Sequence, residues 1–388
     1  MTPTGQFHLV TLGCPKNEVD SDKLAGTLVA DGMVPTDQVE DAELIVVNTC
    51  AFVEDARRES IDTVLALADE RQAGARLVVT GCMAERYGTE LADELPEVDQ
   101  VVGFGVPVVM GKTRSNGAPP PVMDLLNLPR PASTRPWAYV KVAEGCDRAC
   151  GYCAIPSFRG PQRSRSPESV LAEVDGLGVR EVVLVAQDLA AYGRDQGVGE
   201  KALVTLLLAV ADRVDWVRLL YLYPSEVTDP LVDAVCASGV PYFDLSLQHV
   251  SRPLLRRMRR WGDGDRFSAL VERIRRREPD ATFRSNFIVG YPGETEEDHD
   301  ELLAFVADAG LDWCGFFAFS EEVGTHAEGL DGAVAAPLVA ERLRELGELQ
   351  DAITASKRDA LIGRQVEVLV DEPGWGRTHR EAPEIDGL

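Results

Sequence analysis

The chain has 388 residues, more than one hydrophobic core usually supports, so we expect two or three domains. Its formal net charge of −25 argues against a partner made mainly of phosphate backbone and favours a basic protein partner. The sequence lacks a basic-then-apolar targeting signal, and its longest apolar run, 203–211, is too short to span a bilayer. We therefore expect a cytoplasmic protein without a membrane partner, in which eight cysteines favour metal binding or catalysis over disulfides.

The first hundred residues repeat one pattern three times, in which an apolar, strand-like run ends in a cysteine. The three runs span residues 8–14, 43–50 and 76–82. Helix-like sequence follows each run, and strand–helix repetition predicts a parallel sheet whose ligands collect beyond the carboxyl ends of its strands. We therefore expect Cys14, Cys50 and Cys82 to meet in one small space, within an α/β domain over residues 1–116.

A proline-rich stretch over residues 117–136 predicts a linker to a second domain over residues 137–362. Six strand candidates alternate with helix-like stretches in that domain. The strand candidates are 137–144, 181–188, 217–223, 242–249, 283–290 and 313–320, and the clearest helical stretches are 167–177, 202–214 and 296–309. Six successive βα units predict a partial (βα)6 barrel with its active site at the carboxyl ends of the strands.

The end of the chain predicts a long polar helix over residues 337–361 and another strand over residues 364–370. Residues 363–388 are too few for a closed β-barrel of five strands. The segments 363–370 and 384–387 resemble the start of a C-terminal substrate-binding β-barrel domain, and this resemblance implies that residues 363–388 are the incomplete start of such a domain.

Three cysteines follow the first strand of the predicted barrel within eight residues, at Cys146, Cys150 and Cys153. A structural zinc site uses four protein ligands, whereas a 4Fe-4S cluster held by three thiolates leaves one iron open to a substrate. We favour the cluster, with structural zinc and unligated thiols as the alternatives.

This CxxxCxxC motif, with Tyr152 before its last cysteine, resembles the signature of the radical S-adenosylmethionine superfamily. The resemblance implies that the open iron binds S-adenosylmethionine, and that one electron then cleaves the cofactor to a 5′-deoxyadenosyl radical. It also implies an electron donor, either a reductase or a flavodoxin-type protein. The resemblance makes Tyr152 a candidate contact for S-adenosylmethionine. Gln187 and Arg284 resemble positions that face the S-adenosylmethionine pocket, although a structural role is an alternative for each.

The N-terminal trio of cysteines has a simpler interpretation as buried structural residues. Together with the barrel motif, however, the trio resembles the methylthiotransferase family, which implies a second 4Fe-4S cluster with an open iron on Cys14, Cys50 and Cys82. Three segments most resemble the members of that family that act on ribosomal protein uS12. They are 13–21 (GCPKNEVDS), 154–160 (AIPSFRG) and 247–251 (LQHVS).

The resemblance implies that this protein adds a methylthio group to the β-carbon of an aspartate in uS12, either free or within the small subunit. Relatives that modify tRNA typically carry Gln-Met where this chain has Pro15-Lys16, and a tRNA adenosine methylthiotransferase is the alternative function. An electron-transfer protein without its own substrate is a further alternative. We expect a monomer.

Two runs of arginines, 256–260 and 273–277, stand out in so acidic a chain. Solvated helix faces are the simpler interpretation, and a docking patch is the alternative. Asp147 and Arg148, inside the CxxxCxxC loop, are interpreted as residues that keep the loop soluble rather than as part of the chemistry.

Overall fold

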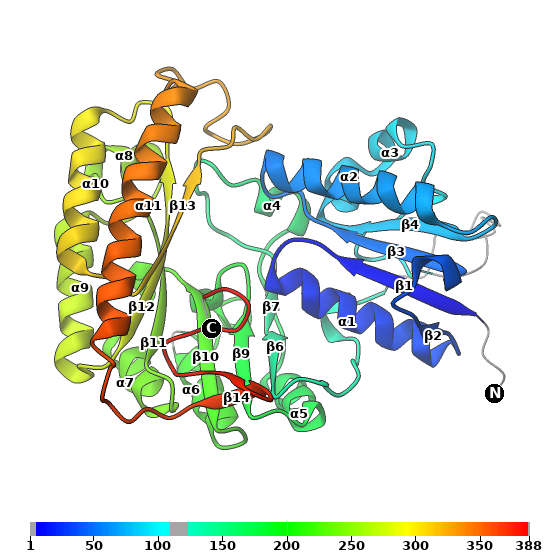
Figure 1. Ribbon diagram of the computed structural model, residues 1–388, viewed down its shortest axis with the longest axis horizontal. Coiled ribbons are helices and arrows are strands. Elements are labelled where there is room, and N and C mark those ends of the chain that lie inside the picture. Colours follow the sequence, from blue (N-terminus) through cyan, green and yellow to red (C-terminus); the bar gives the residue numbers. More distant parts are fainter. Residues whose placement is uncertain (1–4, 109–122, 200, 387–388) are drawn as a thin grey trace.

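Two parallel sheets organise the chain in the computed structural model, which describes residues 5–108, 123–199 and 201–386 (Figure 1). The expected α/β class is confirmed. The sheets lie side by side, with the N-terminal sheet at the right of Figure 1 and the larger sheet at the left.

The first sheet has five parallel strands in the order β2-β1-β3-β4-β5. Its strands are β1 (Gln6–Thr11), β2 (Val34–Pro35), β3 (Leu44–Thr49), β4 (Arg76–Gly81) and β5 (Gln100–Val101), and its helices are α1 (Pro15–Ala30), α2 (Glu54–Glu70) and α3 (Cys82–Glu94). The central strand β3 is buried along its whole length, because α1 packs on one face of the sheet and α2 and α3 pack on the other. The three strands that end at a cysteine, β1, β3 and β4, are neighbours in this sheet, so their carboxyl ends lie together.

The second sheet has six parallel strands in chain order. They are β6 (Trp137–Lys141), β9 (Glu181–Val185), β10 (Trp216–Leu222), β11 (Tyr242–Gln248), β12 (Thr282–Val289) and β13 (Trp313–Ala318). Each overlaps one of the six predicted strands. Strands β6 and β13 form the two edges of this sheet and are not paired with each other, which agrees with a partial barrel.

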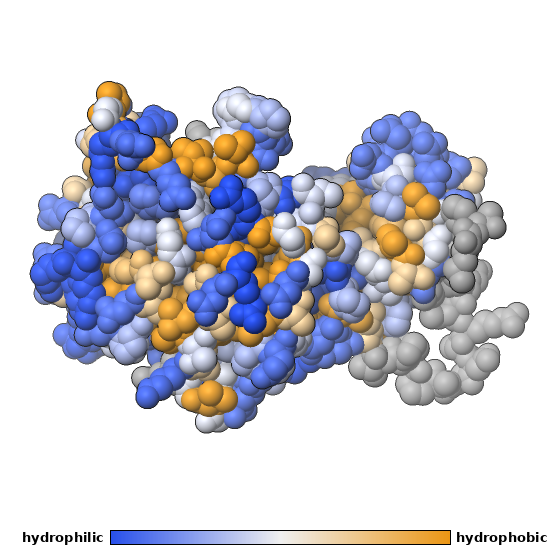
Figure 2. Space-filling view, turned by 90° about the horizontal axis from the view of Figure 1, so that it is seen from below, coloured by the Kyte–Doolittle hydropathy of each residue, from blue (hydrophilic) through white to orange (hydrophobic). Residues whose placement is uncertain are grey.

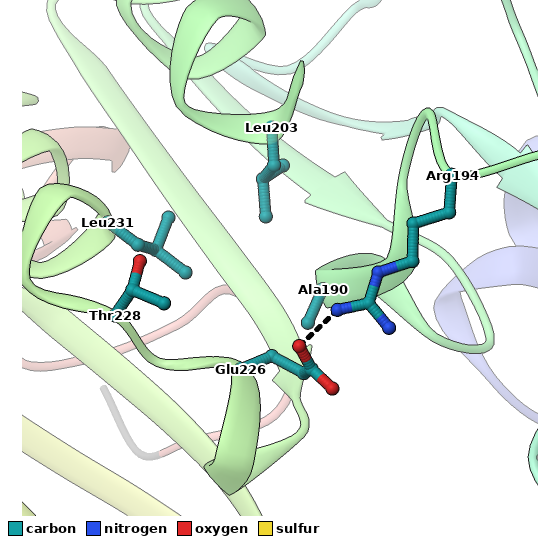
Figure 3. Close-up of a pocket in the computed structure, with 6 residues that line it drawn as sticks. All are labelled: Ala190, Arg194, Leu203, Glu226, Thr228 and Leu231. Carbon is teal, nitrogen blue, oxygen red and sulfur yellow. Dashed lines mark hydrogen bonds and ion pairs between the residues drawn. The ribbon is translucent and has the colours of Figure 1, made fainter. Parts of the chain in front are cut away.

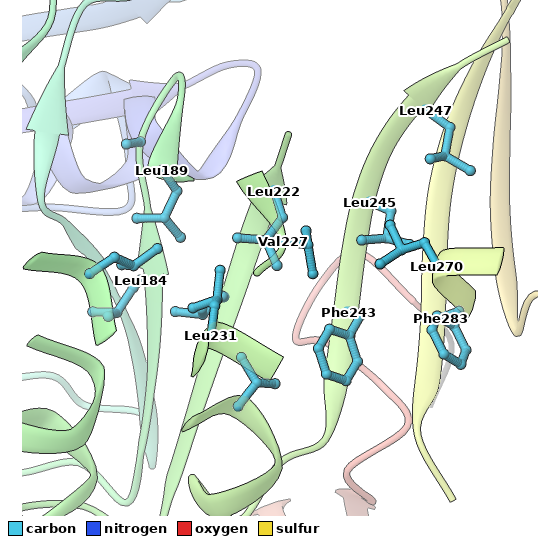
Figure 4. Close-up of a cluster of buried hydrophobic side chains, with 14 of the residues drawn as sticks. Leu184, Leu189, Leu222, Val227, Leu231, Phe243, Leu245, Leu247, Leu270 and Phe283 are labelled. Atoms are coloured by element: carbon cyan, nitrogen blue, oxygen red, sulfur yellow. The ribbon is translucent and has the colours of Figure 1, made fainter. Parts of the chain in front are cut away.

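Helices cover the outer face of the six-stranded sheet, as Figure 1 shows for α9, α10 and α11. The helices are α5 (Pro167–Leu177), α6 (Lys201–Ala211), α7 (Asp229–Ala237), α8 (Arg252–Arg257), α9 (Gly264–Arg277), α10 (Glu296–Ala309) and α11 (Ala336–Asp359). The main hydrophobic core lies between strands and helices, where Phe243 and Phe283 stack at 5.8 Å (Figure 4). Helices α5 and α10 begin and end at the predicted residues because strong caps mark them, including a capping box at Thr295 and Asp298.

The opposite face of the six-stranded sheet packs against α1 and the end of the chain. An antiparallel hairpin, β14 (Leu369–Glu372) and β15 (Trp375–Arg377), leads into the C-terminal segment, which crosses this sheet (Figure 1). Tyr139 donates a hydrogen bond to the Pro383 carbonyl at 2.8 Å. The predicted strand over 364–370 is wrong for residues 364–368, which are exposed and pair with no strand of the described residues.

Part of the predicted linker is packed. Its residues 117–122 lie outside the described residues, but Leu125 and Leu126 form a buried 3-10 turn, η2 (Leu125–Asn127). Lys23 of α1 donates to the Leu126 carbonyl at 2.5 Å. The two leucines therefore fix this stretch against α1, although its prolines indicated a loose connection.

The smaller elements lie between the sheets or at strand ends. They are β7 (Ala143–Glu144), β8 (Arg163–Ser164), α4 (Ile155–Arg159) and the 3-10 turns η1 (Val39–Asp41), η3 (Leu189–Ala191) and η4 (Pro224–Glu226). The face seen from below is largely hydrophilic over the six-stranded part, with apolar patches between (Figure 2). Within the described ranges, each helix is too short or too polar to cross a membrane.

Candidate functional site

Cys14, Cys50 and Cys82 gather beyond the carboxyl ends of β1, β3 and β4. Cys50 and Cys82 are buried, and charge on Cys14 would raise the pKa of both other thiols, so the three share one electrostatic environment. Gly13 makes this possible, because its φ of +93° suits glycine and a Cβ there would lie 2.9 Å from Cys50 Sγ. The structure thus brings together three residues that are far apart in the sequence.

Two cations act on this N-terminal trio. Burial raises the pKa of the Cys50 thiol to about 12, and it raises the pKa of Cys82 as well, where Arg159 opposes the effect. At Cys14 burial also disfavours the thiolate, but Lys16 and Arg159 outweigh it, and the pKa lies below its usual value. Because iron binds the thiolate, these cations favour the ligating form.

Arg159 is the side chain that joins the N-terminal trio to the barrel. It is 1% exposed, and its Nη2 donates to Cys82 Sγ at 3.0 Å and to Asn17 Oδ1 at 2.7 Å. Its Nη1 donates to Asp20 at 3.1 Å and to Glu144 at 3.0 Å. This arginine therefore contacts both the cysteine-bearing loops of the first sheet and the end of strand β7.

Lys141 completes this buried charge network. Its ammonium donates to Asp20 Oδ1 at 2.6 Å and also pairs with Glu144. Burial disfavours the charged form of Glu144, but Arg159 and Lys141 overcome it and lower its pKa to about 2. The network lies between the two sheets and holds the Glu144 carboxylate ionised, and sequence reasoning did not identify it.

Cys146, Cys150 and Cys153 occupy the loop between β7 and α4. Gly145 precedes them at φ +79°, where a Cβ would collide with the Pro161 carbonyl, so glycine is required for the chain to turn into the loop. Burial raises the pKa of Cys146 to about 11 and that of Cys153 to about 12, and charge on Cys150 would raise both further. These thiols also interact, and loading them with metal would release protons.

Two arginines at this loop both contact the ring of Tyr223. Arg148 lies 4.0 Å and Arg260 4.2 Å from the centre of the Tyr223 ring, and Arg260 Nη1 donates to Cys150 Sγ at 3.4 Å. Arg260, at the end of the first arginine run, is buried, so the interpretation as a solvated residue is wrong for it. At both trios, therefore, a buried arginine side chain donates a hydrogen bond to one cysteine sulfur.

Arg148 is anchored by carboxylates rather than exposed for solubility. It donates to Asp188 at 2.5 Å and to Glu226 at 3.1 Å, and Glu226 also pairs with Arg194. Figure 3 shows the ion pair of Glu226 and Arg194, which line a small pocket together with Ala190, Leu203, Thr228 and Leu231. The earlier interpretation of Arg148 is therefore wrong, because its ion pairs fix the CxxxCxxC loop to strand ends β9 and β10.

The three predicted cofactor contacts have different surroundings. Tyr152 is half-buried inside the loop, and Gln187 Nε2 donates to Glu144 Oε1 at 2.8 Å while its own Oε1 has no hydrogen-bond partner among the described residues. Arg284 is only the third residue of β12 and pairs with Asp244 at 3.2 Å and Asp386 at 3.3 Å. Gln187 therefore lies in the network beside the cysteine loop, whereas Arg284 is engaged further down the strand.

Backbone strain marks the carboxyl ends of β10 and β11. Tyr221 and Gln248 adopt φ of +67° and +74°, which side chains other than glycine rarely do, and the pairing of β10 with β11 and of β11 with β12 shifts register there. The Lys16 ammonium lies 3.5 Å from the centre of the Tyr221 ring. Strain of this kind clusters at functional sites, and here it directs Tyr221 toward the N-terminal trio.

The donor chemistry fits two iron-sulfur clusters. Among the described residues, no three side chains of His, Cys, Asp or Glu converge closely enough for a single metal ion. A four-iron cluster makes a different demand, because each thiolate binds its own iron and the sulfurs stand further apart. Three thiols, an adjoining glycine and an arginine that donates to one sulfur occur at both sites.

Two family models match the chain: residues 6–103 match the Uncharacterized protein family UPF0004, and residues 140–306 match the Radical SAM superfamily. The ribosomal protein uS12 methylthiotransferase RimO of Saccharopolyspora erythraea is 44% identical over 98% of this chain and 88% of its own length. The protein of the same name from Moorella thermoacetica is 44% identical over 98% of this chain and 91% of its own length. The chain belongs to the ribosomal protein uS12 methylthiotransferase family.

The family predicted from the sequence is thus confirmed. The two segments that match the family models contain the N-terminal and the barrel cysteine trio, respectively. Among solved structures, the radical S-adenosylmethionine methyltransferase TsrM from Kitasatospora setae has a similar fold, with a TM-score of 0.51. The match covers 82% of this chain and 75% of that chain, and the two sequences are 16% identical. At that identity the similarity concerns the fold alone.

Proposed function

We propose that this protein transfers a methylthio group to the β-carbon of an aspartate in ribosomal protein uS12, replacing one hydrogen. One observation carries the proposal: the helix α4 separates the two cysteine trios. It begins two residues after Cys153 and ends at Arg159, which donates to Cys82. Five helical residues span about 8 Å, so two groups held by the trios would lie close enough to serve one substrate atom.

In this proposal Cys146, Cys150 and Cys153 hold one 4Fe-4S cluster and Cys14, Cys50 and Cys82 hold a second. A cluster on three thiolates supplies an open iron for S-adenosylmethionine and, when reduced, the electron that cleaves its sulfonium bond. Radical chemistry suits the substrate, because the β-carbon of an aspartate carries no readily removed proton.

The surrounding residues orient these groups and exclude water. Arg148 and Arg260 fix the barrel loop around Tyr223, and Arg159 fixes the N-terminal trio against it. We propose two contacts for S-adenosylmethionine: Tyr152, and Gln187 Oε1, which has no hydrogen-bond partner in the described part of the chain. Arg284 would first have to release Asp386, so its proposed contact with the cofactor depends on movement of the C-terminal segment.

The charge of the chain supports a protein substrate. A net charge of −25 attracts a basic ribosomal protein at long range and repels RNA over most of the surface. The relatives named above are uS12 methylthiotransferases, which favours the same choice. We propose that the protein acts as a cytoplasmic monomer that receives electrons from a reductase or flavodoxin-type protein.

The decisive experiment incubates the anaerobically reconstituted protein with uS12 and, in parallel, with tRNA at the same ionic strength. Mass spectrometry should find one methylthio group on an aspartate of uS12 and none on tRNA. Modified adenosine together with unmodified uS12 would overturn the proposal in favour of the tRNA alternative.

Cysteine variants test the two clusters separately. The intact protein should bind about eight irons, and replacing either trio by alanine should leave about four. Alanine at Cys146, Cys150 and Cys153 should abolish cleavage of S-adenosylmethionine, whereas alanine at the N-terminal trio should leave cleavage intact but stop methylthio transfer. Production of 5′-deoxyadenosine by the barrel triple variant would contradict the assignment.

A further inference from the structure

The first arginine run forms an exposed basic patch on α8 and the turn after it. Arg252, Arg256 and Arg259 are exposed and Arg257 is half-buried. Arg257 pairs with Asp331, but within the described residues Arg252, Arg256 and Arg259 form no ion pair with a carboxylate. The net charge of the chain is −25, so these unpaired arginines form a local region of positive charge on an acidic protein. Such a region attracts an acidic partner electrostatically and repels a basic one.

This basic patch lies directly against the barrel cysteine loop. The Gly151 amide, between Cys150 and Cys153, donates to the Met258 carbonyl at 2.7 Å, and Met258 stands between Arg257 and Arg259 in the chain. The next arginine, Arg260, donates to Cys150 Sγ. Arg256, Arg257 and Arg259 are thus within two residues of a direct contact with the loop that would hold the reducible cluster, and Arg252 begins the same helix, α8.

An exposed aromatic side chain adjoins the patch. Trp261 is 40% exposed, follows Arg260, and lies 5.4 Å from the guanidinium of Arg266 to its ring centre. Tryptophan and arginine are the residues most enriched where protein interfaces gain their binding energy. The surface therefore combines charge for steering with an apolar anchor.

We propose that this basic patch is the docking surface for an acidic, flavodoxin-type electron donor. The inference rests on the proposed function, which requires one low-potential electron at the barrel cluster. The docked flavoprotein is oxidised by one electron as that cluster is reduced by one, and no bond is made or broken between the partners. A partner of that charge is repelled by the rest of the acidic chain, which restricts productive encounters to this patch.

The second arginine run is a natural control, because it has the same composition without these features. Arg273 and Arg277 both pair with Asp229, and Arg276 pairs with Glu272 on the same helix. The run ends α9, which leads into the start of β12, so it lies toward the amino ends of the strands. The cysteine loop lies at their carboxyl ends.

The test compares the double variant Arg252→Glu/Arg256→Glu with the control Arg276→Glu, both at exposed positions that touch neither cysteine trio. A purified bacterial flavodoxin with its reductase supplies electrons in one arm, and dithionite supplies them in the other. With flavodoxin below saturation, the double variant should cleave S-adenosylmethionine about tenfold more slowly or worse, whereas its rate with dithionite should equal that of the wild type. The control should match the wild type in both arms.

Binding gives a readout that does not depend on activity. Flavodoxin should bind the double variant about tenfold more weakly than the wild type, and the salt dependence of its affinity should flatten. Equal affinity and equal flavodoxin-driven rates would overturn the proposal. So would slower methylthio transfer to uS12 with dithionite at an unchanged cleavage rate, because the patch would then serve the substrate. Failure of the wild type to cleave S-adenosylmethionine even with dithionite would instead refute the proposed function.

Discussion

Replacing Arg159 by alanine should be among the most destabilising single changes in this protein. The side chain is buried and shares Asp20 and Glu144 with Lys141. Glu144 has a pKa of about 2 against an ordinary 4.5, a difference that corresponds to about 3 kcal/mol at 1.36 kcal/mol per pKa. Arg159 is the larger of the two cationic contributions, so roughly 2 kcal/mol of this stabilisation should disappear with it.

The total loss should be larger, because Asp20 and Asn17 lose hydrogen bonds as well. Removing one partner from a buried ionic network typically costs about 3 to 5 kcal/mol, and we expect a value in that range. Urea-induced unfolding of the metal-free, reduced protein measures it directly. Arg159→Lys should lose less, about 1 to 2 kcal/mol, since it keeps the charge but not the forked donors.

Arg163→Ala is the matched control. Arg163 lies four residues further on and pairs with Asp124 at 2.8 Å, but both side chains are about half exposed, so its removal should cost at most about 0.5 kcal/mol.

The contribution of Glu144 to the free energy of unfolding should also depend on pH. Because the folded pKa of Glu144 is lowered, its contribution is present above pH 4.5 and is lost as the pH falls toward 2, and Arg159→Ala should weaken that dependence. Surface substitutions usually change the free energy of unfolding by no more than about 0.5 kcal/mol. A change of that size for Arg159→Ala would refute this reasoning.

Two further predictions concern other buried groups. Burial lowers the pKa of His249 to about 4. Between pH 6.5 and 4 the imidazole is therefore protonated in the unfolded chain but neutral in the folded chain. The free energy of unfolding should fall by about 3 kcal/mol as the pH is lowered across that interval. His249→Asn, which keeps an acceptor for the Ser251 amide, should flatten this part of the stability curve, and equal slopes for both proteins would contradict the assignment. Glu322 is 2% exposed and accepts from Arg57 at 2.6 Å and Arg86 at 2.7 Å, which joins α2 and α3 to the segment after β13. Glu322→Gln should lower the free energy of unfolding, measured by urea denaturation, by about 3 kcal/mol. A loss under about 0.5 kcal/mol would mean that water replaces the carboxylate as the partner of Arg57 and Arg86.

The regular elements near the sites could be predicted because their patterns are local. Buried parallel strands read as continuous apolar runs, and each of the six barrel strands was found within a few residues. The meeting of Cys14, Cys50 and Cys82 followed from topology, since adjacent parallel strands end at one edge. Strands β2 and β5 have two residues each, too few to show a period, and were missed.

The side chains that complete the sites could not be predicted, because their contacts span long stretches of chain. Arg159 reaches Asn17 across 142 positions and Arg260 reaches Cys150 across 110. Nothing in the residues beside either arginine distinguishes it from a solvated one. The error at residues 364–368 has the opposite cause, since their alternating pattern suits a strand but no partner strand of the described residues lies beside them.

The placement of these arginines also answers a difficulty posed by the net charge. At each trio, three thiolates and the proposed cluster would add negative charge to a protein that already carries −25, and the six cysteines are buried or half-buried. A buried charge is tolerated only where it is paired, and each trio has one buried guanidinium that donates to a sulfur, Arg159 at Cys82 and Arg260 at Cys150. The acidic surface and the buried arginines therefore have different roles. The acidic surface would attract a basic substrate, and the arginines stabilise thiolates that lie close together.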